Sequence, residues 1–288
     1  MNKAAAGRSL IASLLVLAWM PAGWASTPTA NTPSALAPSC PPSTPDSKPA
    51  IDPAAINALE ACLQQLPQTK TLHWRQNRYA ADRQRLHAQI VASTRTGARC
   101  VKPGVQPLAV LTGGPPGAGK STWLAHHLPS LMQPGWLRID ADELRAQLPE
   151  YRGWNSNQTH SETSDLVNSL LATIGRPCNT NLLYDGTLTS PRRYLELLPR
   201  LKKLGYRTFI VQVMVPESVS RQRSLERYQR TGRYVPEEAI QSYYTQAAAT
   251  FALLKTKVDG TVQVDGLNNR TVSTSGQPLP ITMLNLAP

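Results

Sequence analysis

One short stretch of the chain combines residue types that bind phosphate. Residues 114–121, GPPGAGKS, hold three glycines and end in Lys120 and Ser121. Glycine lets successive backbone N–H groups point inward at an anion, and a helix that starts there adds the positive end of its dipole. In such a loop the lysine reaches the outer phosphates and the serine ligates Mg²⁺. The residues predicted to contact a nucleoside triphosphate are Gly114, Gly117, Ala118, Gly119, Lys120, Ser121 and Thr122.

The next candidate residues are acidic. Asp140 and Asp142 end one apolar run, and Asp185 ends another. A carboxylate here can accept the proton of an acceptor hydroxyl, so Asp142 is the candidate base, with Asp140 bracing the turn or the metal. Asp185, before Gly186, is a candidate partner of Mg²⁺ through water. The alternative interpretation of Asp140 and Asp142 is a helix N-cap. The alternative interpretation of Asp185 is an ordinary Asp-Gly turn.

Arginines recur at helical spacing later in the chain. Arg223, Arg227 and Arg230 share one face of a predicted helix, and Arg233 follows it after a glycine. Clustered guanidinium groups can hold a triphosphate and neutralise the charge that develops during transfer, and a closing lid could bring them in. The other interpretation is a basic surface helix with Glu226 as its counter-charge.

The elements that position these residues alternate between strands and helices. Alternation of apolar strands with helices predicts an α/β fold of three layers with a mostly parallel sheet, whose functional residues gather at the carboxyl ends of the strands. Two helices are predicted ahead of this core, between residues 53 and 96. The predicted strands are 108–114, 135–142, 180–187, 207–215 and 261–266.

The ends of the chain indicate export. Residues 1–25 show a positive start, an apolar core and small residues at a cleavage site, which is the plan of a signal peptide, with an uncleaved anchor as the alternative. Residues 26–52 are proline-rich and predict an extended linker. The folded domain is then 53–288, which we divide into helices (53–106), core (107–266) and tail (267–288). We expect the protein to be periplasmic or secreted.

The net charge and the cysteines indicate which classes of partner and which bonds to expect. The chain has 30 Lys and Arg against 18 Asp and Glu, a net charge of +12, which favours anionic partners. We find no basic platform interleaved with aromatic residues, so nucleic acid is not expected. The four cysteines form no C-x-x-C pair, which argues against zinc, and behind a signal peptide they permit disulfides. Cys62 with Cys100 is the favoured pair; Cys40 or Cys178 could be unpaired.

Several segments together resemble a known family. LTGGPPGAGKST, RIDADELRAQLPEY, HSETSD, LLYDGTL and RSLERYQRTGRYVP, within residues 76–245, are similar to the zeta toxins, in that family's order. Zeta toxins are P-loop kinases of bacterial toxin–antitoxin systems. The resemblance implies a P-loop kinase-like fold and a phosphotransferase that uses ATP and Mg²⁺. Its acceptor would be a hydroxyl of a nucleotide-linked metabolite, best known as UDP-N-acetylglucosamine.

The resemblance also assigns roles to individual residues. Lys120 and Ser121 match the family's P-loop, Asp142 matches its catalytic base, and Arg227 and Arg233 match its ATP-binding arginines.

Further roles concern the acceptor. Asp185 stands where the family has an acidic residue before Gly-Thr. Glu162 is the candidate for the acidic residue that holds the sugar substrate, with Asp165 as the competing choice. Asp140 and Asp185 complete the candidate substrate-binding set.

The signal peptide, linker and cysteines depart from the family's cytoplasmic members. They favour an exported toxin or effector, whose antitoxin or immunity protein is not visible in this sequence. Two other functions stay open: a polynucleotide-end kinase, and an ATP-binding module without transfer activity.

Overall fold

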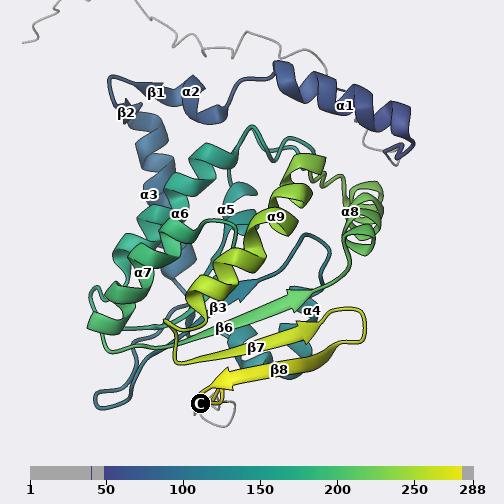
Figure 1. Ribbon diagram of the computed structural model, residues 1–288. Helices are drawn as coiled ribbons and strands as arrows, with labels where there is room; N and C mark the ends of the chain where they lie inside the picture. Colours follow the sequence, from purple (N-terminus) through teal and green to yellow (C-terminus); the bar gives the residue numbers. More distant parts are fainter. Residues whose placement is uncertain (1–39, 41–48, 281–288) are drawn as a thin grey trace, which may run out of the picture. The chain divides into compact units, whose positions relative to one another are not determined.

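A computed structural model describes residue 40 and residues 49–280 of the chain (Figure 1). Its main sheet has six strands in the order β4-β5-β3-β6-β7-β8. Neighbouring strands run parallel, except that β8 is antiparallel to β7. The strands are β3 (Leu108–Gly113), β4 (Trp136–Asp140), β5 (Asn181–Asp185), β6 (Arg207–Met214), β7 (Gly260–Asp265) and β8 (Arg270–Gly276). The predicted α/β fold with a mostly parallel sheet is confirmed.

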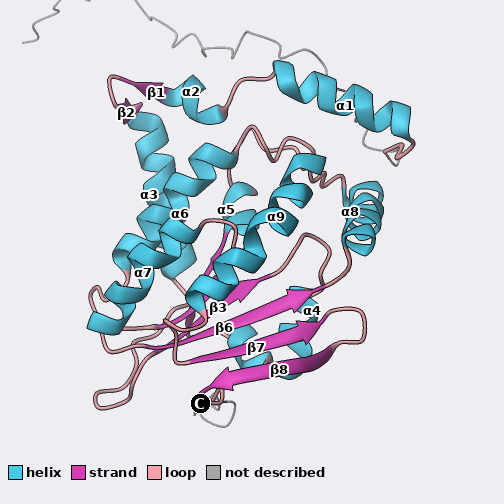
Figure 2. Cartoon of the chain, in the orientation of Figure 1, coloured by secondary structure: helices cyan, strands magenta, loops and turns pink. Residues whose placement is uncertain are grey.

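Helices cover both faces of this sheet (Figure 2). The central strand β3 shows why, because it is apolar and buried on both sides, as a central parallel strand should be. Ala109 and Leu111 pack against one layer of helices, and Leu108 and Val110 pack against the other. The first layer contains α3 (Ala81–Arg95), α6 (His160–Thr173), α7 (Pro191–Lys203) and α9 (Glu237–Leu254). The second contains α4 (Lys120–His127) and the 3₁₀-helix η1 (Pro129–Met132).

The remaining core helices follow strands directly. The short α5 (Ala141–Arg145) begins where β4 ends, and α8 (Glu217–Thr231) follows β6. Because β4, β5, β3 and β6 are parallel, their carboxyl ends lie along one edge of the sheet. The start of α4, the start of α5 and Asp185 are therefore brought to this edge, as the strand pattern predicted.

The N-terminal part contains more than the predicted helical pair. It has α1 (Pro53–Gln65), α2 (Thr69–His73), a hairpin of β1 (Trp74–Arg75) and β2 (Arg78–Tyr79), and then α3. Asp52 caps α1 through a 3.0 Å hydrogen bond from the Ala55 N–H, as its position before Pro53 predicted. Two residues of left-handed backbone, Gln76 and Asn77, turn the chain from β1 into β2, and α3 begins only after this hairpin.

The disulfides correct one prediction. Cys40 is bonded to Cys62 and Cys100 to Cys178, with Cα–Cα distances of 5.6 and 5.7 Å. The favoured pairing of Cys62 with Cys100 is therefore wrong. The reason is local strand pairing: Cys100 forms an antiparallel bridge with Thr180, which places it beside the loop that carries Cys178.

Three predictions concern the ends. The predicted signal peptide, 1–25, lies outside the described residues, as does most of the linker. Part of the predicted tail forms β8, so the sheet continues beyond residue 266. Among the described helices, none has the length and apolar character needed to cross a bilayer.

Candidate active site

The phosphate-binding loop connects β3 to α4, as its sequence required. Its backbone is left-handed at Gly117 (φ 72°) and Gly119 (φ 87°), a conformation that glycine adopts readily. Space is also restricted at Gly117, where a Cβ would come within 2.9 Å of the Cβ of Arg223. Gly119 is the N-cap of α4, so the unpaired N–H groups of the first helical turn face the loop. The loop thus has the geometry of an anion cradle.

Lys120 lies across this loop. Its Nζ donates to the carbonyl oxygens of Gly114 (3.1 Å) and Pro115 (3.4 Å). Burial lowers the pKa of the Lys120 ammonium, and Asp185 acts in the opposite direction. Among the residues that the structure describes, the ammonium is bound only by the carbonyls of its own loop. An incoming phosphate oxygen would therefore replace these carbonyls without breaking an ion pair.

Two carboxylates stand side by side at the ends of neighbouring strands. Asp140 and Asp185 are register partners in the β4–β5 pair. The Thr112 hydroxyl donates to Asp185 Oδ1 at 2.6 Å, which leaves the second carboxylate oxygen for another partner. Asp140 has both oxygens engaged: Oδ1 accepts the Asp142 N–H at 2.8 Å, and Oδ2 accepts from Arg138 Nη2 at 3.0 Å. Asp140 therefore acts as the N-cap of α5, which orients Asp142.

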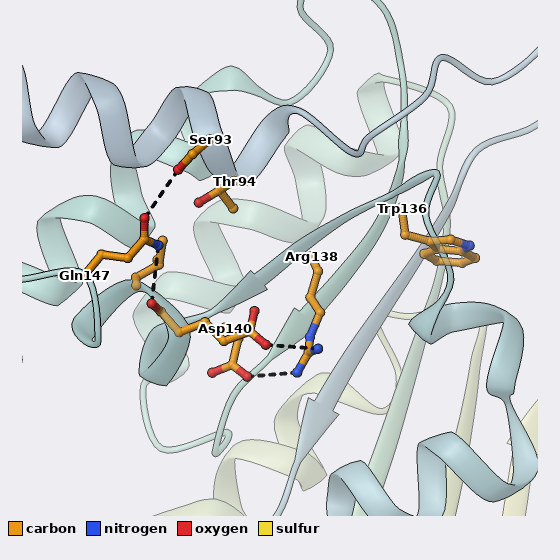
Figure 3. A pocket seen from close by; sticks show the side chains of 8 residues that line it. Ser93, Thr94, Trp136, Arg138, Asp140 and Gln147 are labelled. Atoms are coloured by element: carbon orange, nitrogen blue, oxygen red, sulfur yellow. Dashed lines mark hydrogen bonds and ion pairs between the residues drawn. The ribbon is translucent and has the colours of Figure 1, made fainter. Parts of the chain in front are cut away.

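The environment behind Asp140 is a small cavity of 210 Å³ (Figure 3). Figure 3 shows Arg138 reaching toward the carboxylate of Asp140, with a dashed line for the contact. Arg138 also pairs with Glu143 at 3.0 Å, so its charge is balanced by two carboxylates. The ion pairs of Arg138 with these two carboxylates brace the turn that carries Asp142.

Asp142, the candidate base, lies in the first turn of α5. Its Oδ1 accepts from Arg145 Nη1 at 2.9 Å, and its Oδ2 is in contact with Arg233 Nη2. The Asp142 side chain is 38% exposed, whereas that of Arg145 is only 10% exposed. The Asp142 carboxylate is therefore partly exposed to the cleft, and the buried Arg145 side chain holds it in place.

Three arginines surround Asp142 and the loop, and we call Arg145, Arg227 and Arg233 the arginine rim. The Nε atom of each is buried and has no hydrogen-bond partner among the described residues. Burial lowers the pKa of all three guanidinium groups. Guanidinium groups still carry their charge at neutral pH, so the rim places three cations along the cleft.

A single cleft of 1160 Å³ joins these groups. Its lining includes Asp140, Asp142, Asp185, Arg227, Arg233 and residues 117–122 of the loop. Gly114 does not line it, because Gly114 lies beneath Lys120. The structure therefore brings together all the predicted site residues except Gly114 and Glu162.

The predicted role of Glu162 in substrate binding needs correction. Glu162 is fully buried on α6 and does not line the cleft. It pairs with Arg83 through Nε–Oε1 at 2.5 Å and Nη2–Oε2 at 2.9 Å, and with His87 at 2.6 Å. Burial alone raises the pKa of Glu162, but hydrogen bonds from His87 and Arg83 outweigh it and lower the pKa to about 2. With Glu150, these residues form what we call the buried ion cluster.

The competing choice, Asp165, is also occupied elsewhere. It accepts a hydrogen bond from the Tyr79 hydroxyl at 2.6 Å and pairs with Lys70 at 2.8 Å. Both candidate acidic residues of α6 thus connect the N-terminal elements to the core.

Sequence reasoning missed some cleft residues. Arg145 could have been found, because it lies three positions after Asp142 on the same helix, where the two side chains meet. Arg193, at the start of α7, lines the cleft and donates to the Tyr184 hydroxyl at 3.2 Å, but no spacing in the sequence marks it. Arg223 was noted for its spacing only; its Nη1 donates to the carbonyls of Gly117 and Gly266 at 3.3 Å.

The residues that line the cleft are suited to bind a nucleoside triphosphate together with Mg²⁺. The guanidinium groups of the rim, which line the cleft, and the glycine cradle suit a polyphosphate. Mg²⁺ is usually held by one or two protein oxygens together with phosphates and water. Ser121 and Asp185 could supply such oxygens. Within residues 49–280, no three His, Cys, Asp or Glu side chains form a closed metal cage.

The loop between β3 and α4, on a mostly parallel sheet, makes this a P-loop protein of the kinase-like class. The sequence model of the Zeta toxin family matches residues 92–275. The chain belongs to the zeta toxin family. A search of curated protein sequences finds no match.

Solved structures show the same fold. One from the PezAT chromosomal toxin–antitoxin system of Streptococcus pneumoniae matches with a TM-score of 0.56 and 22% identity, over 72% of this chain and 87% of that chain. The AvrRxo1-ORF1:AvrRxo1-ORF2 complex with sulphate ions matches with a TM-score of 0.54 and 16% identity, over 75% and 69%. The same pair with ATP matches with a TM-score of 0.53 and 15% identity, over 75% of this chain and 69% of that chain.

Proposed function

We propose that the protein is an ATP- and Mg²⁺-dependent kinase that phosphorylates a hydroxyl of a nucleotide-linked metabolite, with a UDP-sugar such as UDP-N-acetylglucosamine as the acceptor. One observation carries the proposal: Asp142, the phosphate-binding loop and the three arginines of the rim line one cleft. At 1160 Å³ the cleft is larger than a pocket for one small ligand, which supports two substrates bound together. Membership of the zeta toxin family supports the choice of acceptor.

The chain's own residues would divide the work as follows. Backbone N–H groups of the loop and Lys120 bind the phosphates, while Arg227 and Arg233 bind oxygens that gain charge during transfer. Ser121 and Asp185 hold the metal. ATP with Mg²⁺, when bound, supplies the activated terminal phosphoryl group. That a structural relative binds ATP supports this choice of nucleotide.

Asp142 would prepare the acceptor. An ionised carboxylate at the start of α5 can take the proton from the acceptor hydroxyl as the oxygen attacks phosphorus. Arg145 orients this carboxylate from below and keeps its other oxygen directed into the cleft. The N-cap bond from Asp140 fixes the turn that both residues share.

Three parallel incubations test the proposal. The mature protein is mixed with γ-labelled ATP and Mg²⁺, with a UDP-sugar, a short oligonucleotide, or no acceptor. We expect label on the UDP-sugar. Label on the oligonucleotide would favour a polynucleotide-end kinase, and ATP binding without transfer would favour a binding module. Asp142→Asn should lower transfer by about 10²- to 10⁴-fold without loss of folding; full transfer by this variant would remove Asp142 as the base.

We also propose that the protein is exported and acts as a toxin or effector in another cell, where ATP is available. The signal-like residues 1–25 support this, as do the two disulfides, which persist in oxidising compartments. The relatives from paired toxin–antitoxin complexes support an antitoxin or immunity partner. Mass spectrometry of the mature N-terminus in fractionated cells is the test. A chain that keeps residues 1–25 and stays in the cytoplasm would contradict export.

A further inference from the structure

Helix α1 lies ahead of residues 92–275, the region that the family model matches, yet it packs against the segment that carries Arg233. Leu59 and Leu63 of α1 are almost fully buried, and so are Tyr228 and Tyr234. These four side chains form a small core separate from the two beside the sheet. The α1 surface therefore covers the end of α8 and the residues that follow it.

The carboxylate of Glu60 on α1 adds hydrogen bonds to this packing. Glu60 Oε1 accepts the Tyr234 hydroxyl at 2.5 Å and also the Glu237 N–H at 3.3 Å. Burial, followed by the hydrogen bond to Glu60, raises the pKa of Tyr234, so its hydroxyl stays protonated and donates. One carboxylate of α1 thus fixes the chain on the C-terminal side of Arg233.

The other sides of the same segment are also held. The Ser156 hydroxyl donates to the Tyr234 carbonyl at 3.1 Å. A Cβ at Gly153 would come within 2.7 Å of the Gly232 carbonyl, so these two backbones lie close together. The loop with Ser156 is itself tied to α1, because Gln158 Nε2 donates to the Leu63 carbonyl at 2.6 Å. Gly232 and Tyr234 are therefore fixed, while Arg233 between them points into the cleft.

We propose that α1 is a positioning element for the nucleotide site: Glu60, through Tyr234, holds the backbone from which Arg233 reaches the phosphates of ATP. Arg233 is the group that touches the ligand; Glu60 and Tyr234 act only through it. The inference rests on the proposed binding of ATP by this cleft. It extends the working unit of the protein beyond residues 92–275 to a helix that packs against the segment carrying Arg233.

Binding measurements on the full mature protein test this role. We expect Tyr234→Phe and Glu60→Ala each to raise the Kd for ATP about 5- to 10-fold, an effect of the size of one ordinary hydrogen bond. Glu60→Gln keeps an acceptor oxygen and should restore most of the affinity. The matched control is Tyr206→Phe, which removes another buried tyrosine hydroxyl, bonded to the Thr180 carbonyl at 2.6 Å near the amino end of β6. It should alter thermal unfolding but not the Kd.

A double-mutant cycle separates positioning from general stability. In an Arg233→Ala background, Tyr234→Phe should have no further effect on the Kd. An equal effect with and without Arg233, or wild-type affinity in Tyr234→Phe and Glu60→Ala, would overturn the inference. If the wild-type protein itself fails to bind ATP, the proposed function falls and this inference falls with it. If the wild-type protein binds ATP and the variants bind it equally well, only this inference is contradicted and the proposed function is not.

Discussion

Two groups of arginines and carboxylates in this molecule differ in how their hydrogen bonds are used. In the buried ion cluster, Arg83 has every guanidinium nitrogen engaged, by Glu162 at 2.5 and 2.9 Å and by Glu150 at 2.7 and 3.0 Å. In the arginine rim, the Nε atoms of three arginines have no partner within the described residues. Asp142 is the carboxylate that two of them, Arg145 and Arg233, contact.

The difference distinguishes structural charge from functional charge. A buried ion pair with all donors satisfied fixes one arrangement of its helices, and removing either partner leaves an uncompensated charge. Three arginines that line one cleft and share few carboxylates leave positive charge uncompensated by the protein, which indicates a site for an anionic ligand. Glu162 and Asp142 look alike as acidic residues in the sequence, yet they belong to opposite groups.

The largest effect is expected when the buried ion cluster is broken. Glu162→Ala leaves Arg83 buried without its closest partner and should lower the free energy of unfolding by about 3 to 5 kcal/mol. Urea unfolding at pH 7 measures this change. The fraction that remains folded should still bind ATP. A stability loss below about 1 kcal/mol would show that the cluster is not structural.

Acid should weaken the same cluster. The pKa of Glu162 is about 2 in the folded chain and near its ordinary value of 4.5 in the unfolded chain, so the folded state favours the ionised form. This contribution, of the order of 3 kcal/mol, is fully present above pH 4.5 and is lost as the pH falls toward 2. Unfolding of wild type and Glu162→Gln between pH 6 and 3 should therefore converge at low pH. A constant difference would contradict the depressed pKa.

An intermediate effect is expected at the rim. Arg227→Ala removes a cation with an unpartnered Nε, so it should raise the Kd for ATP about 10-fold. Because the Arg227 side chain has no hydrogen-bond partner within residues 49–280, the free energy of unfolding should change by less than about 1 kcal/mol. Calorimetric titration and urea unfolding of one preparation give both numbers. Strong destabilisation with normal ATP binding would show that Arg227 stabilises the fold and does not contribute to ATP binding.

The smallest effect is expected at an exposed pair. Arg192 and Glu196 are one helical turn apart on α7, at 2.9 Å, with side chains 90% and 67% exposed. Arg192→Ala should change stability by less than about 0.5 kcal/mol. It should leave the Kd for ATP unchanged, which makes it the matched control for Arg227→Ala. A clear loss of ATP affinity would mean that long-range charge, and not the rim, drives binding.

The sequence predicted what local patterns encode. The glycine loop, the apolar strands and the aspartates at strand ends depend on neighbours in the chain, so their positions were predictable. Arg233 was found from its place after a glycine. Glu162 was misassigned because its partner Arg83 lies on a distant helix, and no local pattern pairs them. The disulfides depended likewise on the bridge between Cys100 and Thr180, which only the folded chain creates.

The contact between Arg233 and Asp142 has a kinetic consequence. The ion pair with Arg233 makes the Asp142 carboxylate a weaker base. On the proposed mechanism, a phosphate group that binds Arg233 would draw the guanidinium away and leave this oxygen more basic for the acceptor hydroxyl. The reaction should then be ordered, with nucleotide binding first, and an acceptor that arrives early should wait at an enzyme that is not yet able to deprotonate it.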